Sequence, residues 1–281
     1  MKFAVISDLH LDINKEYPVL DRLAEMAAAG RADGILIAGD ITEHVSESIS
    51  AMEQLEQKSG CRVFYVPGNH DLWSGDFSQL TTEEIYARYE ADPRCLTGKP
   101  QILQGKDGVF ALIGDVGWYD YSFANPRFSE TELEQMNRDG RTWQDKLKNQ
   151  WTADNLQRMK IQSGKLEMRL AQIRSRYGTD LPVIVMTHMI PVREFCVPEE
   201  RTMWQYFNAY LGSAHLGELF ERYRVSYSIS GHVHYRKEAI HGATRYLCPC
   251  LGYHSEWKLY NEAHGTDLDW QLINTLHWIE I

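Results

Sequence analysis

Short apolar runs alternate with stretches of helical spacing along the first part of the chain. Compact apolar runs at residues 3–6, 35–38 and 62–66 are of the length expected for buried strands. Between them, residues 19–29 and 45–57 carry apolar positions at the spacing of an amphipathic helix. This alternation predicts an α/β fold with a largely parallel sheet, whose ligands bind at the carboxyl ends of the strands.

Further buried strands are predicted in the rest of the chain, at residues 109–113, 182–186 and 225–229. Short alternating pieces follow position 238. No run approaches the roughly 18 apolar residues of a transmembrane helix. The length of 281 residues fits one large domain that carries an insertion.

That insertion is predicted from a change in composition. Residues 118–128 are aromatic and loop-like, whereas residues 129–176 are polar, compatible with helix and poor in β-branched residues. We interpret about 117–180 as a helical and aromatic insertion within a single domain of residues 1–281. Two arrangements are open: the insertion packs on the flank of the sheet, or it caps a site.

Charge and cysteine content limit the partners and the compartment. The chain has 29 Lys and Arg against 39 Asp and Glu, and its formal charge of −10 argues against binding to duplex nucleic acid. Five cysteines at irregular spacing, with Cys248-Pro-Cys250 as the one close pair, suit a reducing compartment. The first residues fit a strand rather than a signal peptide. We therefore expect a cytoplasmic protein; nothing in the composition indicates its oligomeric state.

Polar clusters follow five of the predicted strands. They are Asp8 with His10, Asp40, Asn69-His70-Asp71, His188, and His232 with His234. Residues two apart in an extended segment project to the same side, so the first and last pairs can each bind one ion. A lone histidine after a strand is usually structural, but five such clusters at the carboxyl ends of one sheet indicate a metal site.

The number of candidate ligands favours two ions over one. Four imidazoles (His10, His188, His232, His234), two carboxylates (Asp8, Asp40) and the Asn69 amide oxygen make seven candidates. If Asp40 bridges, two ions about 3.5–4 Å apart each receive four protein ligands. The cost of a carboxylate at the mouth of a buried strand is then offset by two cations. Nitrogen and oxygen ligands without thiolate suit Mn²⁺, Fe or Zn²⁺.

The motifs D-x-H, GD, GNHD, H and GHVH, in this order, resemble the signature of the calcineurin-like metallophosphoesterases, and they extend from residue 8 to residue 234. The resemblance implies a two-sheet β-sandwich flanked by helices, in four αββα layers. It assigns Asp8, His10, Asp40 and His234 to one ion, and Asp40, Asn69, His188 and His232 to the other. It also implies that His70 is a catalytic histidine near the scissile ester, with Asp71 as its orienting partner, and it favours manganese.

The activity expected from this resemblance is hydrolysis of a phosphoester by a hydroxide activated between two metal ions. We expect a small phosphoester substrate, with a phosphodiester of a small molecule or nucleotide ahead of a monoester. A nucleotide-lipid pyrophosphate hydrolase is an open alternative. A nuclease is less favoured because of the acidic charge, and a non-catalytic scaffold because no candidate ligand is missing.

Substrate contacts are expected outside the ligand set. Besides Asn69, we consider phosphate contacts from His44 and Arg236, for which a solvated surface position is the alternative. The aromatic segments 118–123 and 193–210 either line a pocket or pack the insertion against the core. Residues 252–254 follow a C-terminal strand that can return to the site.

Overall fold

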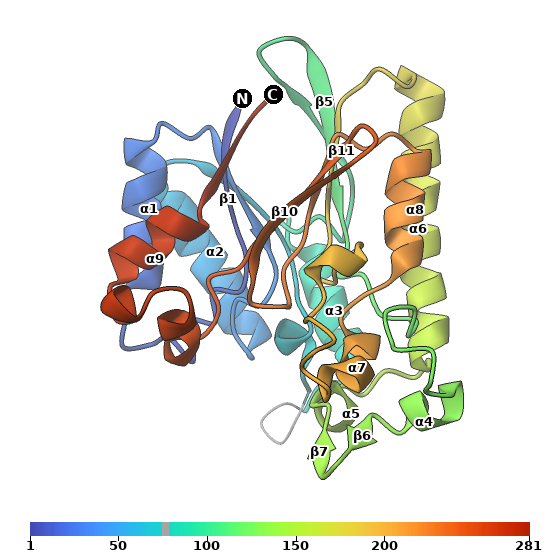
Figure 1. Cartoon of the computed structure of the whole chain (residues 1–281). Coiled ribbons are helices and arrows are strands. Elements are labelled where there is room, and N and C mark those ends of the chain that lie inside the picture. The colour runs from blue at the N-terminus through green and yellow to red at the C-terminus, as the bar shows by residue number, and fades with distance from the viewer. Residues whose placement is uncertain (75–78) are drawn as a thin grey trace.

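Two β-sheets pack face to face at the centre of the computed structural model, which describes residues 1–74 and 79–281 (Figure 1). The first sheet has the order β12-β1-β2-β3. Its strands are β1 (Lys2–Ile6), β2 (Gly34–Ala38), β3 (Arg62–Val66) and β12 (His277–Glu280). β1, β2 and β3 are parallel, as predicted, and β12 is antiparallel to β1.

The second sheet has the order β10-β11-β9-β8-β5-β4. Its strands are β4 (Gln101–Gln104), β5 (Val109–Gly114), β8 (Val183–Met186), β9 (Tyr227–Ile229), β10 (Arg236–His241) and β11 (Thr244–Pro249). The central strands are parallel and the two edge strands are antiparallel. A bridge between Ser7 and Cys250 joins the ends of β1 and β11, so the two sheets converge at their carboxyl ends.

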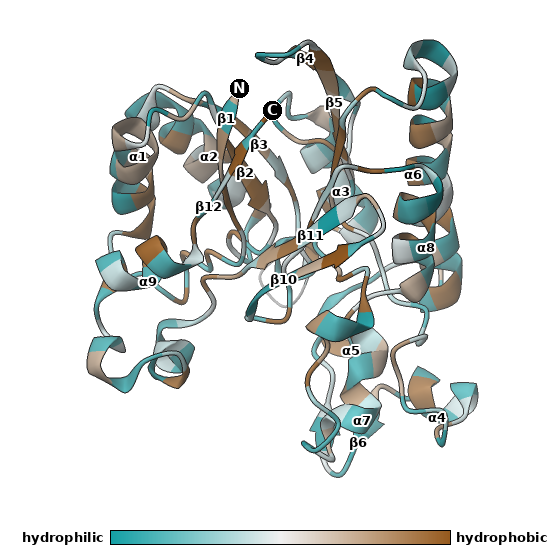
Figure 2. Ribbon diagram, turned by 45° about the horizontal axis from the view of Figure 1, so that its top comes forward, coloured by the Kyte–Doolittle hydropathy of each residue, from teal (hydrophilic) through white to brown (hydrophobic). Residues whose placement is uncertain are grey.

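Alternate residues of the strands form the core between the sheets. This inner core includes Phe3, Val5, Leu36, Ala38, Leu112, Ile184 and Met186. Their neighbours on the same strands, such as Ala4 and Ile35, belong to a second core under the helices. Strands buried on both faces explain the continuous apolar runs of the sequence, and Figure 2 shows hydrophobic residues along the strands of both sheets.

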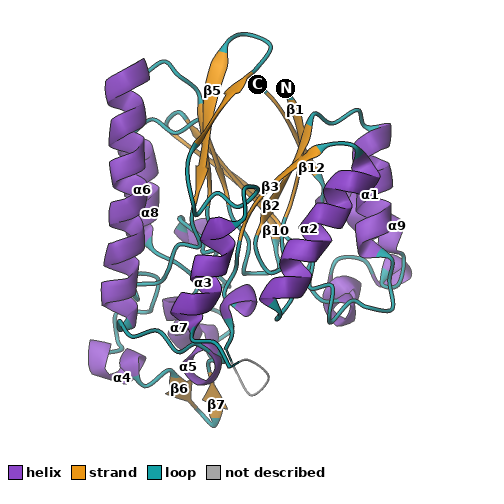
Figure 3. Cartoon of the chain, turned by 180° about the vertical axis from the view of Figure 1, so that it is seen from behind, coloured by secondary structure: helices purple, strands orange, loops and turns teal. Residues whose placement is uncertain are grey.

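Helices cover both outer faces, which gives the expected αββα sandwich (Figure 3). The first sheet is covered by α1 (Val19–Ala29), α2 (Val45–Ser59) and α9 (Leu268–Thr275), and the second by α6 (Asn155–Tyr177) and α8 (Ala214–Arg222). α3 (Thr82–Ala91) begins with a capping box between Thr81 and Glu84. Short 3₁₀ segments are His70–Leu72, Arg193–Phe195, Asn208–Tyr210, His254–Leu259 and Glu262–His264. Within the described residues, no helix combines the length and apolarity that crossing a bilayer requires.

The predicted insertion divides into two parts. After α4 (Glu130–Glu134), a hairpin of β6 (Asn137–Arg138) and β7 (Arg141–Thr142) leads to α5 (Asp145–Lys148); these elements gather with α7 (Trp204–Phe207) at the lower right of Figure 1. α6 instead lies along the flank of the second sheet. Residues 129–176 are therefore not helical throughout, since residues 137–142 form a hairpin. Asp139 and Gly140 adopt positive φ there, and an Asp-Gly pair is a hairpin signal.

Arg169 attaches α6 to the core. Its side chain is buried, and its guanidinium donates hydrogen bonds to four backbone carbonyls at 2.6–3.0 Å. The acceptors are Leu96, Thr97, Gly98 and Gly114. One side chain thus satisfies the carbonyls of a loop and of a strand end.

Replacement of Arg169 by methionine should lower the free energy of unfolding by at least about 3 kcal/mol, because buried acceptors lose their donors. Arg176→Ala, at an exposed position of the same helix, should cost no more than about 1 kcal/mol. Urea denaturation measures both changes. Equal losses in the two variants would contradict the anchoring role of Arg169.

Candidate metal centre

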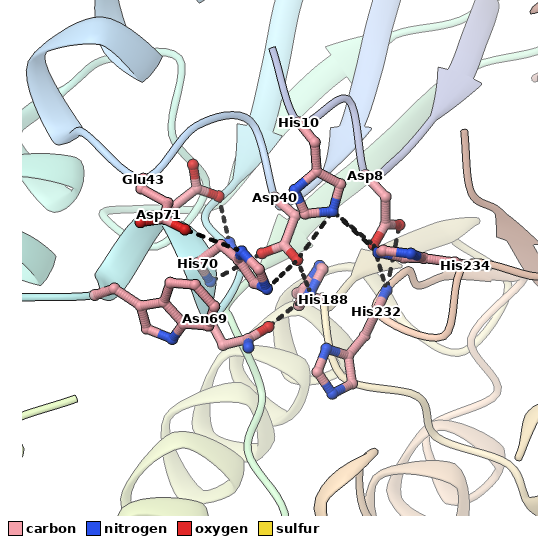
Figure 4. Close-up of polar contacts among 12 residues, drawn as sticks. Asp8, His10, Asp40, Glu43, Asn69, His70, Asp71, His188, His232 and His234 are labelled. Carbon is pink, nitrogen blue, oxygen red and sulfur yellow. Dashed lines mark hydrogen bonds and ion pairs between the residues drawn. The ribbon is translucent and has the colours of Figure 1, made fainter. Parts of the chain in front are cut away.

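The seven candidate ligands meet where the two sheets converge (Figure 4). Asp8 and His10 follow β1, Asp40 follows β2 and Asn69 follows β3. From the second sheet, His188 follows β8, and His232 and His234 follow β9. Each side chain therefore comes from the carboxyl end of a strand, as the sequence predicted, and both sheets contribute.

Their ligand atoms form two groups. Atoms of Asp8, His10, Asp40 and His234 lie within 4.8 Å of one another, as do those of Asp40, His188 and His232. The Asn69 amide oxygen lies 3.1 Å from His188 Nε2 and so extends the second group. Both groups could hold a metal ion, and Asp40 belongs to both.

The two oxygens of Asp40 have different neighbours. Oδ2 lies 3.5 Å from His10 Nε2 and 3.3 Å from His188 Nε2, so this oxygen faces both ligand groups. Oδ1 accepts a hydrogen bond from the His70 backbone amide at 3.0 Å. The His70 amide thus fixes Oδ1 of Asp40, and Oδ2 points into the space between the two ligand groups.

The backbone is strained where the ligands lie. Asp8, His10, Asp40, His232 and His234 all have positive φ, between 41° and 73°. Such conformations cost of order 1–3 kcal/mol each in residues other than glycine, and they cluster at functional sites. These conformations turn the chain directly after the strands, so that the side chains converge in a way that extended strands alone would not allow.

At two positions the backbone passes so close to a ligand carboxylate that only glycine fits. A Cβ at Gly68 would lie 2.1 Å from Asp40 Oδ1, and one at Gly231 would lie 2.5 Å from Asp8 Oδ2. Both contacts are far too short for a side chain. The glycines of GNHD and GHVH therefore provide the space that these carboxylates occupy.

Hydrogen bonds from behind orient three of the imidazoles. His188 Nδ1 donates to the Ala38 carbonyl at 2.8 Å, and His234 Nδ1 lies 2.7 Å from Glu256 Oε2. His232 uses its other nitrogen, since Nε2 donates to the Tyr210 carbonyl at 3.2 Å. These partners leave His188 Nε2, His234 Nε2 and His232 Nδ1 free to act as ligands. Glu256 was not predicted, because nothing near it in the sequence indicates its contact with His234.

The pKa values show how closely the charges are coupled. Burial would raise the pKa of Asp40, but the charge of His188 holds it well below its usual value. Burial lowers the pKa of His232 to about 3, whereas Asp40 outweighs burial at His188 and raises its pKa to about 10. In the metal-free protein, a charged His188 thus compensates the carboxylate. The buried nitrogen and oxygen donors fit divalent cations, which would replace that proton.

His70 lies beside this centre. Its Nε2 is 4.0 Å from Asp40 Oδ2 and 3.4 Å from the Tyr253 hydroxyl, and its ring stacks on Trp73 with centroids 3.6 Å apart. Its Nδ1 is buried 4.0 Å from Glu43 Oε1 and has no hydrogen-bond partner among the described residues. Burial lowers the pKa of His70 to about 4, so the ring is neutral at physiological pH.

Asp71 was expected to orient the His70 ring, but its carboxylate has other partners. Its carboxylate accepts hydrogen bonds from the backbone amides of Ile41, Thr42 and Gly68 and from the Ser48 hydroxyl. Burial and the charge of Asp40 raise the pKa of Asp71 to about 7. Asp71 therefore links the loop that follows Asp40 to the loop that follows β3.

A pocket of about 460 Å³ opens beside the ligands. Besides Asp40, Asn69, His70 and His232, its lining includes Trp73, Trp143, Trp204 and Tyr253. Trp143 comes from the insertion, and Tyr253 from the segment 252–254, whose return to the site the sequence left open. Aromatic residues from distant parts of the chain thus surround the space next to the candidate metal centre.

Other predicted substrate contacts lie outside this pocket. His44 is exposed at the start of α2 and does not line it. Arg236 also does not line it, because its guanidinium stacks on Tyr260 and donates to Gln271 Oε1. Of the aromatic segment 118–123, Trp118 and Tyr119 are fully buried and pack the insertion.

Comparison with known proteins agrees with this geometry. The family model for calcineurin-like phosphoesterases matches residues 1–236. The chain is 22% identical over 274 residues to the acyl-carrier-protein phosphodiesterase PptH of Mycobacterium tuberculosis, covering 90% of this chain and 78% of that protein. Over 79 residues it is 33% identical to a probable cyclic nucleotide phosphodiesterase of Coxiella burnetii, covering 25% of this chain and 32% of that protein.

Solved structures show the same fold. The crystal structure of the phosphopantetheinyl hydrolase PptH from Mycobacterium tuberculosis has a TM-score of 0.74 at 19% identity, with 92% of each chain covered. The TT1561 protein of Thermus thermophilus has a TM-score of 0.55 at 14% identity, with 99% of this chain and 98% of that chain covered. The two-sheet architecture is therefore shared at low sequence identity.

Replacement of Asp40 by asparagine should weaken metal binding at both sites, whereas Asp8→Asn should weaken only one. Loss of a residue that is hydrogen-bonded to a metal ligand lowers metal affinity about 10- to 100-fold, so loss of the ligand itself should lower it at least as much. Titration of chelator-treated protein with Mn²⁺ measures both sites. Two tightly bound ions in the Asp40→Asn variant would contradict a shared carboxylate.

Metal uptake should release protons, and the affinity should rise with pH across the neutral range. The raised pKa of His188, about 10, means that its ring is charged in the metal-free protein, whereas a ligating imidazole must be neutral. Raising the pH removes the competing proton. Calorimetric titration with Mn²⁺ in buffers of different ionisation enthalpy measures the release; pH-independent affinity between pH 6 and 8 would contradict it.

Proposed function

The chain belongs to the calcineurin-like phosphoesterase family, and on this basis we propose that it hydrolyses a phosphodiester at a centre of two divalent metal ions. The observation that carries the proposal is Asp40, one oxygen of which faces both ligand groups beside an aromatic pocket. We assign Asp8, His10, Asp40 and His234 to one ion, and Asp40, Asn69, His188 and His232 to the other. Manganese is the ion we propose for testing first.

When bound, such a pair of ions supplies Lewis acidity toward the phosphoryl oxygens and a nucleophile from water near neutral pH. The protein provides the surrounding groups. His70 projects into the pocket next to Asp40, and its neutral ring has an N–H group that can donate to the leaving oxygen. Trp73 packs against one face of that ring, with the ring planes tilted by 30°.

Asp71 has an indirect role in this proposal. It accepts hydrogen bonds from the backbone amides of Ile41 and Thr42, which directly follow Asp40, and from that of Gly68, which directly precedes Asn69. These hydrogen bonds hold two ligand-bearing loops against each other. We therefore assign Asp71 to the positioning of Asp40 and Asn69.

The pocket supports a diester over a monoester. Its volume of about 460 Å³ exceeds the need of a phosphate group alone and is in the range of small-molecule sites. Trp73, Trp143 and Trp204 can contact an apolar or aromatic group esterified to the phosphate. Both curated relatives are named as phosphodiesterases, one for acyl carrier protein and one for cyclic nucleotides, so these two kinds of diester are the first candidates.

The state of the cysteines bears on the cellular compartment. All five cysteines are buried and form no disulfide, although Cys248 Sγ lies within 3.5 Å of Cys250 Sγ, which supports a reducing compartment such as the cytoplasm. We further propose one metallophosphoesterase domain in which the insertion, about residues 117–180, is an integral part.

Replacement of His70 by alanine should lower turnover by about 10²- to 10³-fold, the usual cost of losing one hydrogen-bond donor to an oxygen that gains negative charge. Its metal content should remain that of the wild type, because the ring lies outside both ligand groups. His44→Ala, at an exposed position outside the pocket, is the matched control and should retain full activity. Loss of both ions from the His70→Ala variant would refute this assignment.

Chelator-treated protein, supplied again with Mn²⁺, should cleave bis(p-nitrophenyl) phosphate faster than p-nitrophenyl phosphate. Release of p-nitrophenol measures both rates, and holo-acyl carrier protein and cyclic nucleotides are then compared under the same conditions. Faster cleavage of the monoester would reject the diester preference. Failure to cleave any of these esters at saturating metal would reject the proposed activity.

A further inference from the structure

The insertion places a buried carboxylate next to the candidate metal centre. Asp145, the first residue of α5, is 3% exposed. Its Oδ1 accepts hydrogen bonds from Asn69 Nδ2 at 2.9 Å and Trp73 Nε1 at 2.7 Å. Its Oδ2 accepts from Trp143 Nε1 at 2.9 Å and from the Tyr119 hydroxyl at 3.4 Å. Four donors thus converge on one side chain.

Neutral groups provide all of these hydrogen bonds. Burial raises the pKa of Asp145, and the bonds from Trp73, Asn69 and Trp143 oppose that shift. Among the described residues, no Lys, Arg or His forms an ion pair with this carboxylate. Four hydrogen bonds offset part of the cost of burying this carboxylate, but no opposite charge pairs with it among the described residues.

The contact with Asn69 determines which way the amide points. A side-chain amide has a donor end and an acceptor end, and exchanging them reverses its chemistry. Because Asn69 Nδ2 donates to Asp145, its Oδ1 points the other way and lies 3.1 Å from His188 Nε2. The acceptor end therefore faces the group of Asp40, His188 and His232.

Two further contacts of Asp145 lead to the same centre. Trp73 stacks on His70 with ring centroids 3.6 Å apart, and Trp143 packs edge-on against His232 with centroids 5.7 Å apart. Asp145 thus touches one candidate ligand directly and contacts the indoles that pack on two more histidines of the site.

We propose that Asp145 is a positioning residue of the metal centre, which fixes the Asn69 amide with its oxygen toward the ion shared by Asp40, His188 and His232. The inference rests on the proposed function, because it takes Asn69 as a ligand. It makes the insertion a part of the active site: residue 145 holds a ligand 76 positions earlier in the chain.

Replacement of Asp145 by alanine should weaken one metal site and spare the other. Metal-free protein is titrated with Mn²⁺, and the free ion is followed by its electron paramagnetic resonance signal. Wild-type protein should bind two ions; the variant should bind one with unchanged affinity and the second about 10- to 100-fold more weakly. Thermal melting checks that each protein is folded at the assay temperature.

Leu133→Ala is the matched control for loosening of the insertion. Leu133 is buried in α4 and belongs to the apolar core, but its side chain is not among the ligand groups or the pocket lining. This variant should bind both ions as the wild type does. Loss of the same ion from Leu133→Ala would show that loosening suffices and would overturn the specific role of Asp145.

A pair of conservative variants tests the hydrogen-bond pattern itself. In Asp145→Asn, the amide oxygen can still accept from Asn69 and Trp73, but its NH₂ group then faces the N–H of Trp143. Adding Trp143→Phe removes that conflict and leaves the NH₂ group to donate to the Tyr119 oxygen. The double variant should therefore bind the second ion more tightly than Asp145→Asn alone, although it carries one more change.

The outcomes separate this inference from the proposed function. If the Asp145→Ala variant binds two ions with the same affinities as the wild type, the role of Asp145 is overturned and the proposed function stays intact. A double variant that is weaker than Asp145→Asn by more than Trp143→Phe alone weakens the wild type would also overturn it. Absence of metal binding by the wild-type protein would refute the proposed function and this inference together.

Discussion

Burial of negative charge between the ends of two sheets is the constraint on which this structure depends. Asp8, Asp40, Asp71 and Asp145 are each at most 3% exposed. An uncompensated buried carboxylate costs several kcal/mol, so each needs partners. Asp71 and Asp145 are each held by four hydrogen-bond donors of the protein. Asp8 and Asp40 also face imidazoles of the two ligand groups, so cations bound there would compensate their charge.

The fold supplies what this arrangement requires. The sheets converge at their carboxyl ends through the contact of Ser7 with Cys250, so ligands from both sheets reach one space. The chain turns there through positive φ at five ligands, and Gly68 and Gly231 leave room for the carboxylates. Strain and tight packing are thus concentrated at the site, while the regular core between the sheets and the flanking helices keep the strand ends in place.

Local patterns predicted the parts of the site that are local in origin. Buried strands are visible as apolar runs, and a polar residue directly after such a run, such as Asp40, must lie at the sheet's end. Contacts that depend on packing between distant segments leave no such signal. Glu256 behind His234 and Asp145 behind Asn69 belong to this class, and so does Trp143 in the pocket. Arg236 does not line the pocket for the same reason, because its partners Tyr260 and Gln271 come from the C-terminal segment. The hairpin at residues 137–142 did leave a signal, the Asp139-Gly140 pair.

The shared oxygen of Asp40 is tested most directly by anomalous diffraction from crystals of the protein soaked in Mn²⁺, with data collected near the manganese absorption edge. Two anomalous peaks are expected on either side of Asp40 Oδ2, one next to His10 and His234 and the other next to His188 and His232. A single peak, or two peaks that do not share Asp40, would contradict this arrangement.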